Sequence, residues 1–154
     1  MENYTAELEQ AFAAYRREIA DYERKSRPTD GLLGFGRSLG NDACHDHLDA
    51  RIEKIVQQAC DAGVAPQEAE ALVRALLLPK PTAPWPVAAQ WMLRAAERHS
   101  IPLIPLLSGE AAAAICREYA VRYRPWDRLP AQKQVLHALS QARGAAAPGT
   151  HGKD

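Results

Sequence analysis

The sequence lacks the features that several classes of protein require. It has no apolar run near the roughly 18–20 residues that a bilayer-spanning helix needs. Its three cysteines, Cys44, Cys60 and Cys116, are an odd number without CxxC spacing, so neither a disulfide framework nor a thiolate zinc site is predicted. The first residues, acidic and then polar, do not form a secretory signal. We therefore expect a soluble cytoplasmic protein with reduced thiols and no membrane contact.

Neither sign of charge is in excess over the whole chain. Lys and Arg number 19, as do Asp and Glu, and this balance argues against a protein that binds polyanions through its global charge. The charges are unevenly spread, however. Residues 101–143 hold six basic groups against three acidic ones, whereas residues 1–63 hold eight against twelve. A local basic surface near the C-terminus therefore stays open as a hypothesis.

Strand-forming residues are scarce as well. Valine and isoleucine together supply 12 of the 154 residues, whereas alanine supplies 29 and leucine 16. Because alanine and leucine favour helices, the composition predicts an all-α fold. The length suits one domain with a substantial core. We predict a single irregular bundle of five to six helices over residues 1–144, with proline-rich apolar connectors, and a disordered C-terminal tail over residues 145–154.

Apolar spacing and capping residues place the predicted helices. An apolar stripe recurs every three or four residues over 4–25. Asn41 or Asp42 is expected to cap the next helix and Gly63 to close it, Pro66 to begin a third, and Ser108 to cap a fifth. The predicted inner stripe of the second helix consists of Cys44, Leu48, Ile52, Ile55 and Ala59, and the third helix is expected to bury Ala69, Leu72, Val73, Leu76 and Leu77. Glycines and prolines predict connectors at 26–40, 79–86 and 100–107, and further helices are expected at 86–99 and from about residue 130 to 143.

The densest set of chemically active side chains lies at the start of the second predicted helix. His45 and Asp49 are four residues apart and share one helix face, with Asp46 alongside. Imidazole and carboxylate groups together suit a divalent ion such as zinc, manganese or iron. His47 points about 200° away from His45, so the two imidazoles cannot bind one ion from a regular helix. Ligands from a second helix would have to complete such a site. The alternative is a solvated first turn, where acidic residues lie favourably against the helix dipole.

Two weaker signals lie in the same part of the chain. A thiol near a helix N-terminus can be activated, but Cys44 shares an apolar stripe with Leu48 and Ile52, so a buried small side chain is favoured. The glycine-rich segment 31–40 resembles a phosphate loop only in composition. It follows a predicted helix, and its glycine spacing fits neither nucleotide fingerprint, so a turn-rich connector is favoured.

Two segments are candidate partner-binding surfaces. The first is the apolar loop that contains Leu32, Leu33 and Phe35, which either packs on the core or forms an exposed patch. The second is a C-terminal cluster of arginines interleaved with aromatic residues. Such side chains suit a protein interface, phosphate contact with base stacking, or the fringe of a core. The cluster consists of Arg117, Arg122, Arg124, Trp126, Arg128 and Lys133, with Tyr119 and Tyr123 between them.

These patterns support three hypotheses of function. The first is a small non-enzymatic protein–protein interaction module. The sequence shows two candidate partner-binding surfaces and no compact set of nucleophile, base and orienting group. The second is a nucleic-acid-associated helical protein that uses the C-terminal Arg/Tyr/Trp cluster. The third is a metal-dependent helical enzyme centred on His45, Asp46 and Asp49. No cofactor other than that divalent metal is suggested, and the oligomeric state is left open.

Overall fold

The computed structural model describes residues 3–26, 34–78, 96–122 and 128–151, and within them the chain is all-α without a strand. This confirms the predicted helical bundle. The 96–100 segment is helical and leads directly into a short 3₁₀ helix. The elements are α1 (Tyr4–Ser26), α2 (Gly34–Ala62), α3 (Pro66–Leu77), the 3₁₀ helix η2 (Ile101–Leu106), α5 (Gly109–Ala120) and α6 (Pro130–His151).

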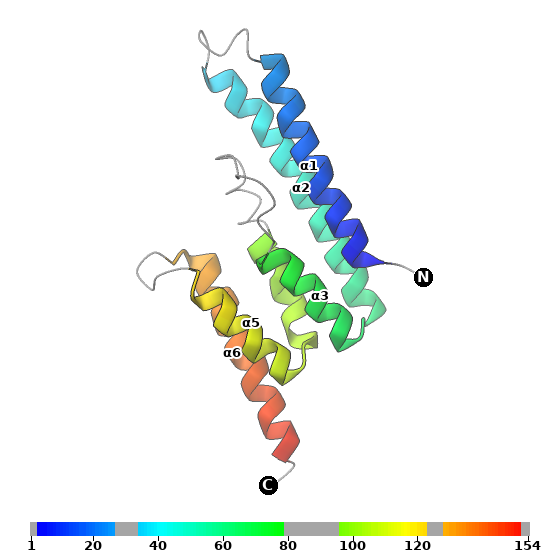
Figure 1. The fold of residues 1–154 in the computed structure, drawn as a ribbon, viewed down its shortest axis with the longest axis vertical. Helices are drawn as coiled ribbons and strands as arrows, with labels where there is room; N and C mark the ends of the chain where they lie inside the picture. The colour runs from blue at the N-terminus through cyan, green and yellow to red at the C-terminus, as the bar shows by residue number, and fades with distance from the viewer. Residues whose placement is uncertain (1–2, 27–33, 79–95, 123–127, 152–154) are drawn as a thin grey trace.

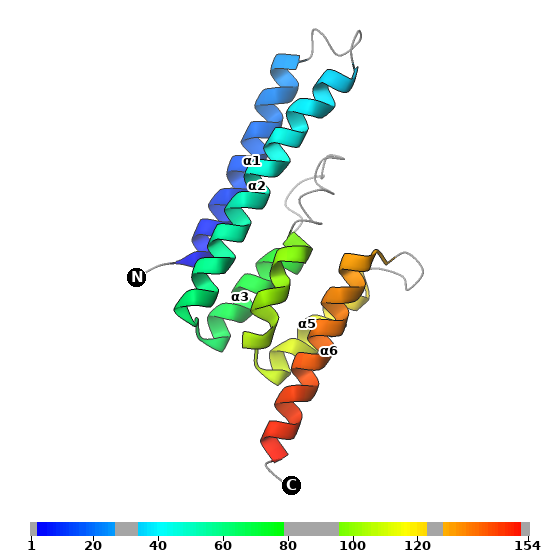
Figure 2. The same cartoon turned by 180° about the vertical axis from the view of Figure 1, so that it is seen from behind.

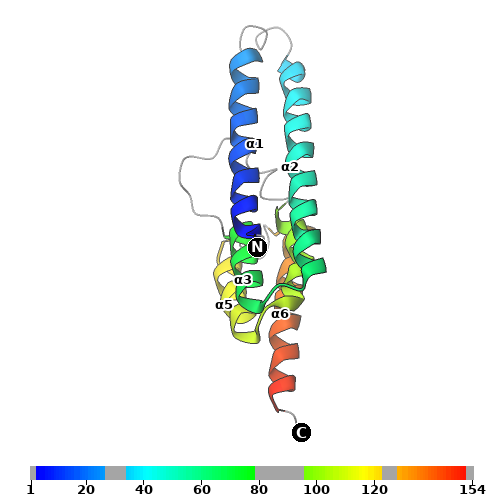
Figure 3. The ribbon, with the colours of Figure 1, turned by 90° about the vertical axis from the view of Figure 1, so that its right-hand side faces the viewer.

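Two antiparallel helix pairs form the frame of the molecule (Figure 1). Helices α1 and α2 make a long hairpin, and α5 and α6 make a second, shorter pair. Helix α3 and η2 lie between the pairs, with α3 against α1 and η2 against both α2 and α6. The end of the α1–α2 hairpin where α1 stops and α2 begins projects beyond the other helices, as the view from behind also shows (Figure 2). In the side view α1 and α2 run parallel to the long axis of the molecule (Figure 3).

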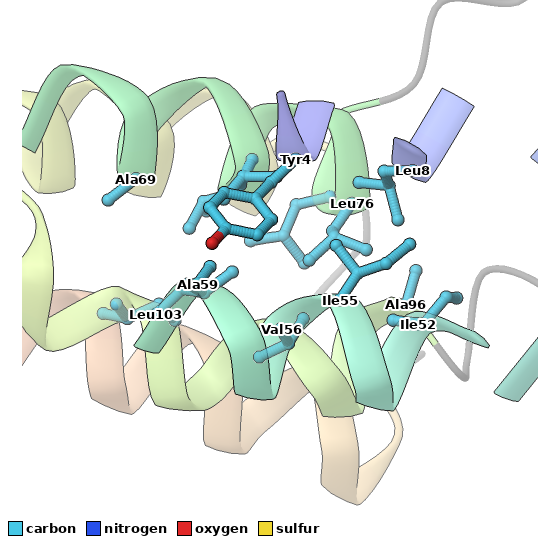
Figure 4. Packing of buried hydrophobic residues seen from close by; sticks show 14 of the residues in the cluster. Tyr4, Leu8, Ile52, Ile55, Val56, Ala59, Ala69, Leu76, Ala96 and Leu103 are labelled. Carbon is cyan, nitrogen blue, oxygen red and sulfur yellow. The ribbon is translucent and has the colours of Figure 1, made fainter. Parts of the chain in front are cut away.

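One hydrophobic core joins all of these elements. Tyr4 and Leu8 reach from α1 toward Ile55, Val56 and Ala59 of α2 at the centre of this cluster (Figure 4). The stripes predicted for two helices are buried as expected. They comprise Cys44, Leu48, Ile52, Ile55 and Ala59 on α2, and Ala69, Leu72, Val73, Leu76 and Leu77 on α3.

The predicted end signals act where they were expected. Gly63 has φ +62°, a left-handed conformation that glycine adopts at little cost, and it ends α2. Pro66 opens α3, where its missing N–H is not needed. The Ser108 hydroxyl accepts a hydrogen bond from the amide of Ala111 at 3.1 Å and caps α5. None of the helices in the part of the chain that the structure describes is long and apolar enough to cross a membrane.

Two helix boundaries differ from the prediction. Helix α2 begins at Gly34 and continues through Gly40, so the expected cap at Asn41 or Asp42 is wrong. The connector expected at 26–40 is therefore wrong for residues 34–40, where Gly34, Gly36 and Gly40 lie inside the helix at a cost of about 1 kcal/mol each. Helix α6 likewise passes through Gly144 and ends at His151. The disordered tail over residues 145–154 stays a prediction, because the side chains of 145–151 and the whole of 152–154 lie outside the described part of the chain.

The proline-containing connector at 100–107 also takes a definite form. Within this expected connector, the chain forms the short helix η2, with Pro102 in its first turn and Pro105 inside it. Leu103 and Ile104 of this short helix are fully buried. The connector expected at 79–86 lies outside the described residues, as does the predicted helix 86–99 up to residue 95.

Candidate functional site

The histidine and acidic residues at 45–49 lie in the middle of α2, and they form separate contacts with other elements. His45 Nδ1 lies 2.8 Å from the hydroxyl of Tyr15 on α1, and Tyr15 is only 3% exposed. Burial, and to a smaller extent Cys44, raises the pKa of Tyr15 far above its usual value. The phenol therefore stays protonated near neutral pH. The hydrogen bond between the two side chains ties His45 to α1.

A second contact joins the exposed His47 to α1. Its Nδ1 lies 3.2 Å from Glu18 Oε1, and Arg51 Nη1 lies 2.9 Å from Glu18 Oε2. Burial raises the pKa of Glu18, but the hydrogen bonds and charges of His47 and Arg51 outweigh it and lower the pKa overall. Glu18 is therefore ionised near neutral pH and lies between two basic groups of α2.

The third contact joins α2 to the 96–100 segment. Asp49 Oδ1 accepts hydrogen bonds from Arg98 Nη2 and His99 Nε2, both at 2.7 Å. Burial raises the pKa of Asp49, but the hydrogen bond and charge of His99 and the pairing with Arg98 produce a net decrease. Asp49 thus holds the segment before η2 against the hairpin.

The proposed metal ligands therefore turn to different partners. His45 bonds to α1, Asp49 bonds to the 96–100 segment, and Asp46 is exposed. Among the residues that the structure describes, no group of three or more His, Cys, Asp or Glu side chains is placed to hold a metal ion. The metal site therefore stays a prediction, and the contacts of His45 and Asp49 do not support it.

Cys44 has the environment of a core residue. Its side chain is 8% exposed. Burial, followed by the negative charge of Glu18, raises the pKa of its thiol, so the thiolate nucleophile is disfavoured. This agrees with the interpretation of Cys44 as a small buried side chain.

The C-terminal Arg/Tyr/Trp cluster is divided between core and surface. Tyr119 is fully buried and donates a hydrogen bond to Glu97 Oε2 at 2.6 Å, so it belongs to the core and not to an exposed patch. Arg117 and Arg122 are exposed. Arg128 is half-buried and donates to the carbonyl oxygen of Ala120 at 3.4 Å, near the end of α5. Three other members, Tyr123, Arg124 and Trp126, lie outside the described residues.

The other predicted partner-binding surface lies mostly outside the described residues. Leu32 and Leu33 lie outside the described residues. Phe35 is the second residue of α2, at the projecting end of the hairpin, and its side chain is not among the described ones.

Two exposed apolar residues flank the end of α5 and were not singled out in the sequence. Val121 is 84% exposed and Leu129 is 37% exposed, and they are the exposed large hydrophobic residues among those described. They stand beside Arg122 and Arg128. We call this set, Val121, Arg122, Arg128 and Leu129, the α5–α6 corner.

Sequence reasoning also missed a buried polar network beneath this corner. Glu97 is 2% exposed, and its Oε2 receives the Tyr119 hydroxyl and, at 3.4 Å, the Gln132 amide. Gln132 Oε1 in turn accepts from the amide of Leu129 at 2.8 Å. Nothing in the local sequence separates Glu97 from a solvated glutamate, because its partners are 22 and 35 residues away.

Comparisons of the chain with protein-family models, with curated proteins and with solved structures find no match. The side chains and surfaces described above are therefore the basis for assigning a function.

Proposed function

We propose that the protein is a small non-enzymatic interaction module that docks onto another protein through the α5–α6 corner. The observation that carries the proposal is the exposure of Val121, at 84%, directly beside the exposed Arg122. Arginine next to accessible apolar surface is typical of interface hot spots. Burial of the Val121 side chain by a partner would remove apolar surface from water, which favours association.

The framework behind the corner favours binding because it holds the corner in place. Gln132 bonds to the amide of Leu129 at the start of α6, and Arg128 bonds to the last turn of α5. Tyr119 of α5 and Gln132 of α6 both bond to Glu97 of the 96–100 segment. A rigid surface loses little conformational entropy when a partner binds. The protein has three free thiols, and reduced cysteines are typical of cytoplasmic proteins. A cytoplasmic location is therefore part of the proposal.

A nucleic-acid partner is the second candidate. Arg117 and Arg122 are both exposed, and no described acidic residue forms an ion pair with either. Phosphate contacts of this kind would make binding strongly dependent on salt. The metal-dependent enzyme is a third alternative, but the contacts of His45 and Asp49 give it no support.

A pull-down of the tagged full chain from its own cell extract, with and without nuclease, tests the proposal. The test variant is Val121→Asp with Arg122→Glu, and the matched control is Gln141→Asp with Arg143→Glu, an exposed pair on α6 with the same change in charge. We expect a stoichiometric protein partner that survives nuclease, is lost with the test variant and is kept with the control.

Other results would overturn this assignment. Equal recovery with both variants would remove the corner as the docking surface. A nuclease-sensitive partner would favour nucleic acid, and salt-dependent binding that falls with Arg117→Glu plus Arg122→Glu would then establish it. Circular dichroism of each variant checks that the fold is intact.

A further inference from the structure

A groove runs along the α1–α2 hairpin, on a surface separate from the α5–α6 corner. Its volume is about 510 Å³. Ala11 and Ala14 of α1 and Ile55 of α2 line its apolar part. Ala11 and Ile55 are almost fully buried and close the floor, at 5% and 6% exposure. The groove exists because alanine at positions 11 and 14 leaves the space between the two helices unfilled.

One end of the groove is cationic. Arg17 of α1 and Arg51 and Lys54 of α2 line it together. Because the helices are antiparallel, Arg17 and Arg51 lie toward the projecting end of the hairpin. Arg51 forms its ion pair with Glu18 at 2.9 Å, so part of its charge is balanced. Arg17 and Lys54 are exposed, and within the described part of the chain neither has an acidic partner.

The other end is polar and not cationic. Gln10 and Gln58 line the groove further from the projecting end, and Glu7 lies beyond them. Glutamine amides donate and accept hydrogen bonds with neutral polar groups, whereas Glu7 disfavours a second negative charge there. From position 7 to position 17 an α-helix rises about 15 Å. The groove therefore suits an elongated ligand that is negative at one end only.

We propose that this groove binds a small molecule with a multivalent oxyanion at one end, phosphate or carboxylate, and an uncharged polar body. The oxyanion would contact the Arg17 guanidinium and the Lys54 ammonium, which form charge-assisted hydrogen bonds with such groups. The uncharged body would lie over Ala11, Ala14 and Ile55 and reach the two glutamine amides. The volume falls in the range of small-molecule sites.

Titration of the ¹⁵N-labelled full chain at low salt tests this proposal, with inorganic pyrophosphate and citrate as separate probes. We expect saturable 1:1 binding, with amide shifts concentrated along the facing sides of α1 and α2. Arg17→Gln with Lys54→Gln should weaken binding about tenfold, as expected for the loss of two exposed charge pairs. The matched control, Lys133→Gln with Arg143→Gln on α6, removes the same charge elsewhere and should leave binding unchanged.

A neutral change separates the groove from general charge attraction. Ala14→Trp fills the groove without altering any charge and should abolish binding, while circular dichroism reports whether the helices remain. Pyrophosphate binding alone would identify a phosphate ligand, and citrate binding alone a carboxylate ligand. The proposal is wrong if neither probe saturates, if the α6 control weakens binding as much as the groove variant, or if folded Ala14→Trp binds normally.

Discussion

The buried bond between Tyr119 and Glu97 leads to a sharp prediction about stability. Tyr119→Phe removes the hydroxyl that donates to Glu97 Oε2 at 2.6 Å, while both side chains are shielded from water. The carboxyl oxygen then keeps the longer 3.4 Å contact with Gln132. Loss of such a buried hydrogen bond costs about 1–3 kcal/mol. For a chain of this size we therefore expect Tm to fall by roughly 3–10 °C.

Chemical and thermal unfolding, followed by circular dichroism, measure this change. The slope of the free energy of unfolding against urea concentration should not change, because the variant alters the stability and not the surface area that unfolding exposes. Glu97→Gln combined with Tyr119→Phe completes a double-mutant cycle, and the two changes should be strongly non-additive. A loss below about 0.5 kcal/mol in Tyr119→Phe, or additive effects in the cycle, would show that the network contributes little to the free energy of unfolding.

Three further predictions concern stability. Leu48→Ala should cost about 2–5 kcal/mol, measured by urea unfolding, because Leu48 is 1% exposed in the core; a loss under 1 kcal/mol would contradict this burial. The pKa of Asp49 is lower in the folded protein than in the unfolded chain, where it is about 3.9. The bonds of Asp49 to His99 and Arg98 therefore stabilise the fold fully above that unfolded-state pKa. This stabilisation is lost as the pH falls through the lower pKa of the folded protein. The Tm difference between wild type and Asp49→Asn should therefore be clear at pH 6 and vanish in strong acid. A Tm difference that does not change with pH would contradict the lowered pKa of Asp49. Gly63→Ala should lower stability by about 1 kcal/mol through its φ of +62° alone, because nothing lies within 4 Å of an added Cβ; Gly63→Asn should cost less, and equal losses would argue against a conformational cause.

The sequence predicted the packed faces of the helices well. The stripe from Leu72 to Leu77 in α3 and the stripe from Cys44 to Ala59 in α2 are buried as expected, because helical spacing alone determines which residues share a face. The end of α2 and the start of α3 also followed from Gly63 and Pro66. These features depend on residues close together in the chain.

Features that depend on distant residues were not predicted. Helix α2 begins at Gly34 although its glycine-rich first turns carry no local helix signal. The burial of Glu97 requires Tyr119 and Gln132, and the groove requires two helices to lie side by side. Likewise, the dispersal of His45 and Asp49 to different partners follows from the neighbours of α2 and not from their spacing.

The arrangement of the helices in two antiparallel pairs has a consequence for folding kinetics. The most extensive helix contacts, α1 with α2 and α5 with α6, join neighbours along the chain. Each hairpin therefore closes through local contacts, which cost little loop entropy and favour rapid formation. The contacts of α3 and η2 then join one hairpin to the other. We expect this docking step to limit the folding rate, so substitutions in the buried face of η2 should slow folding more than equally destabilising ones within either hairpin.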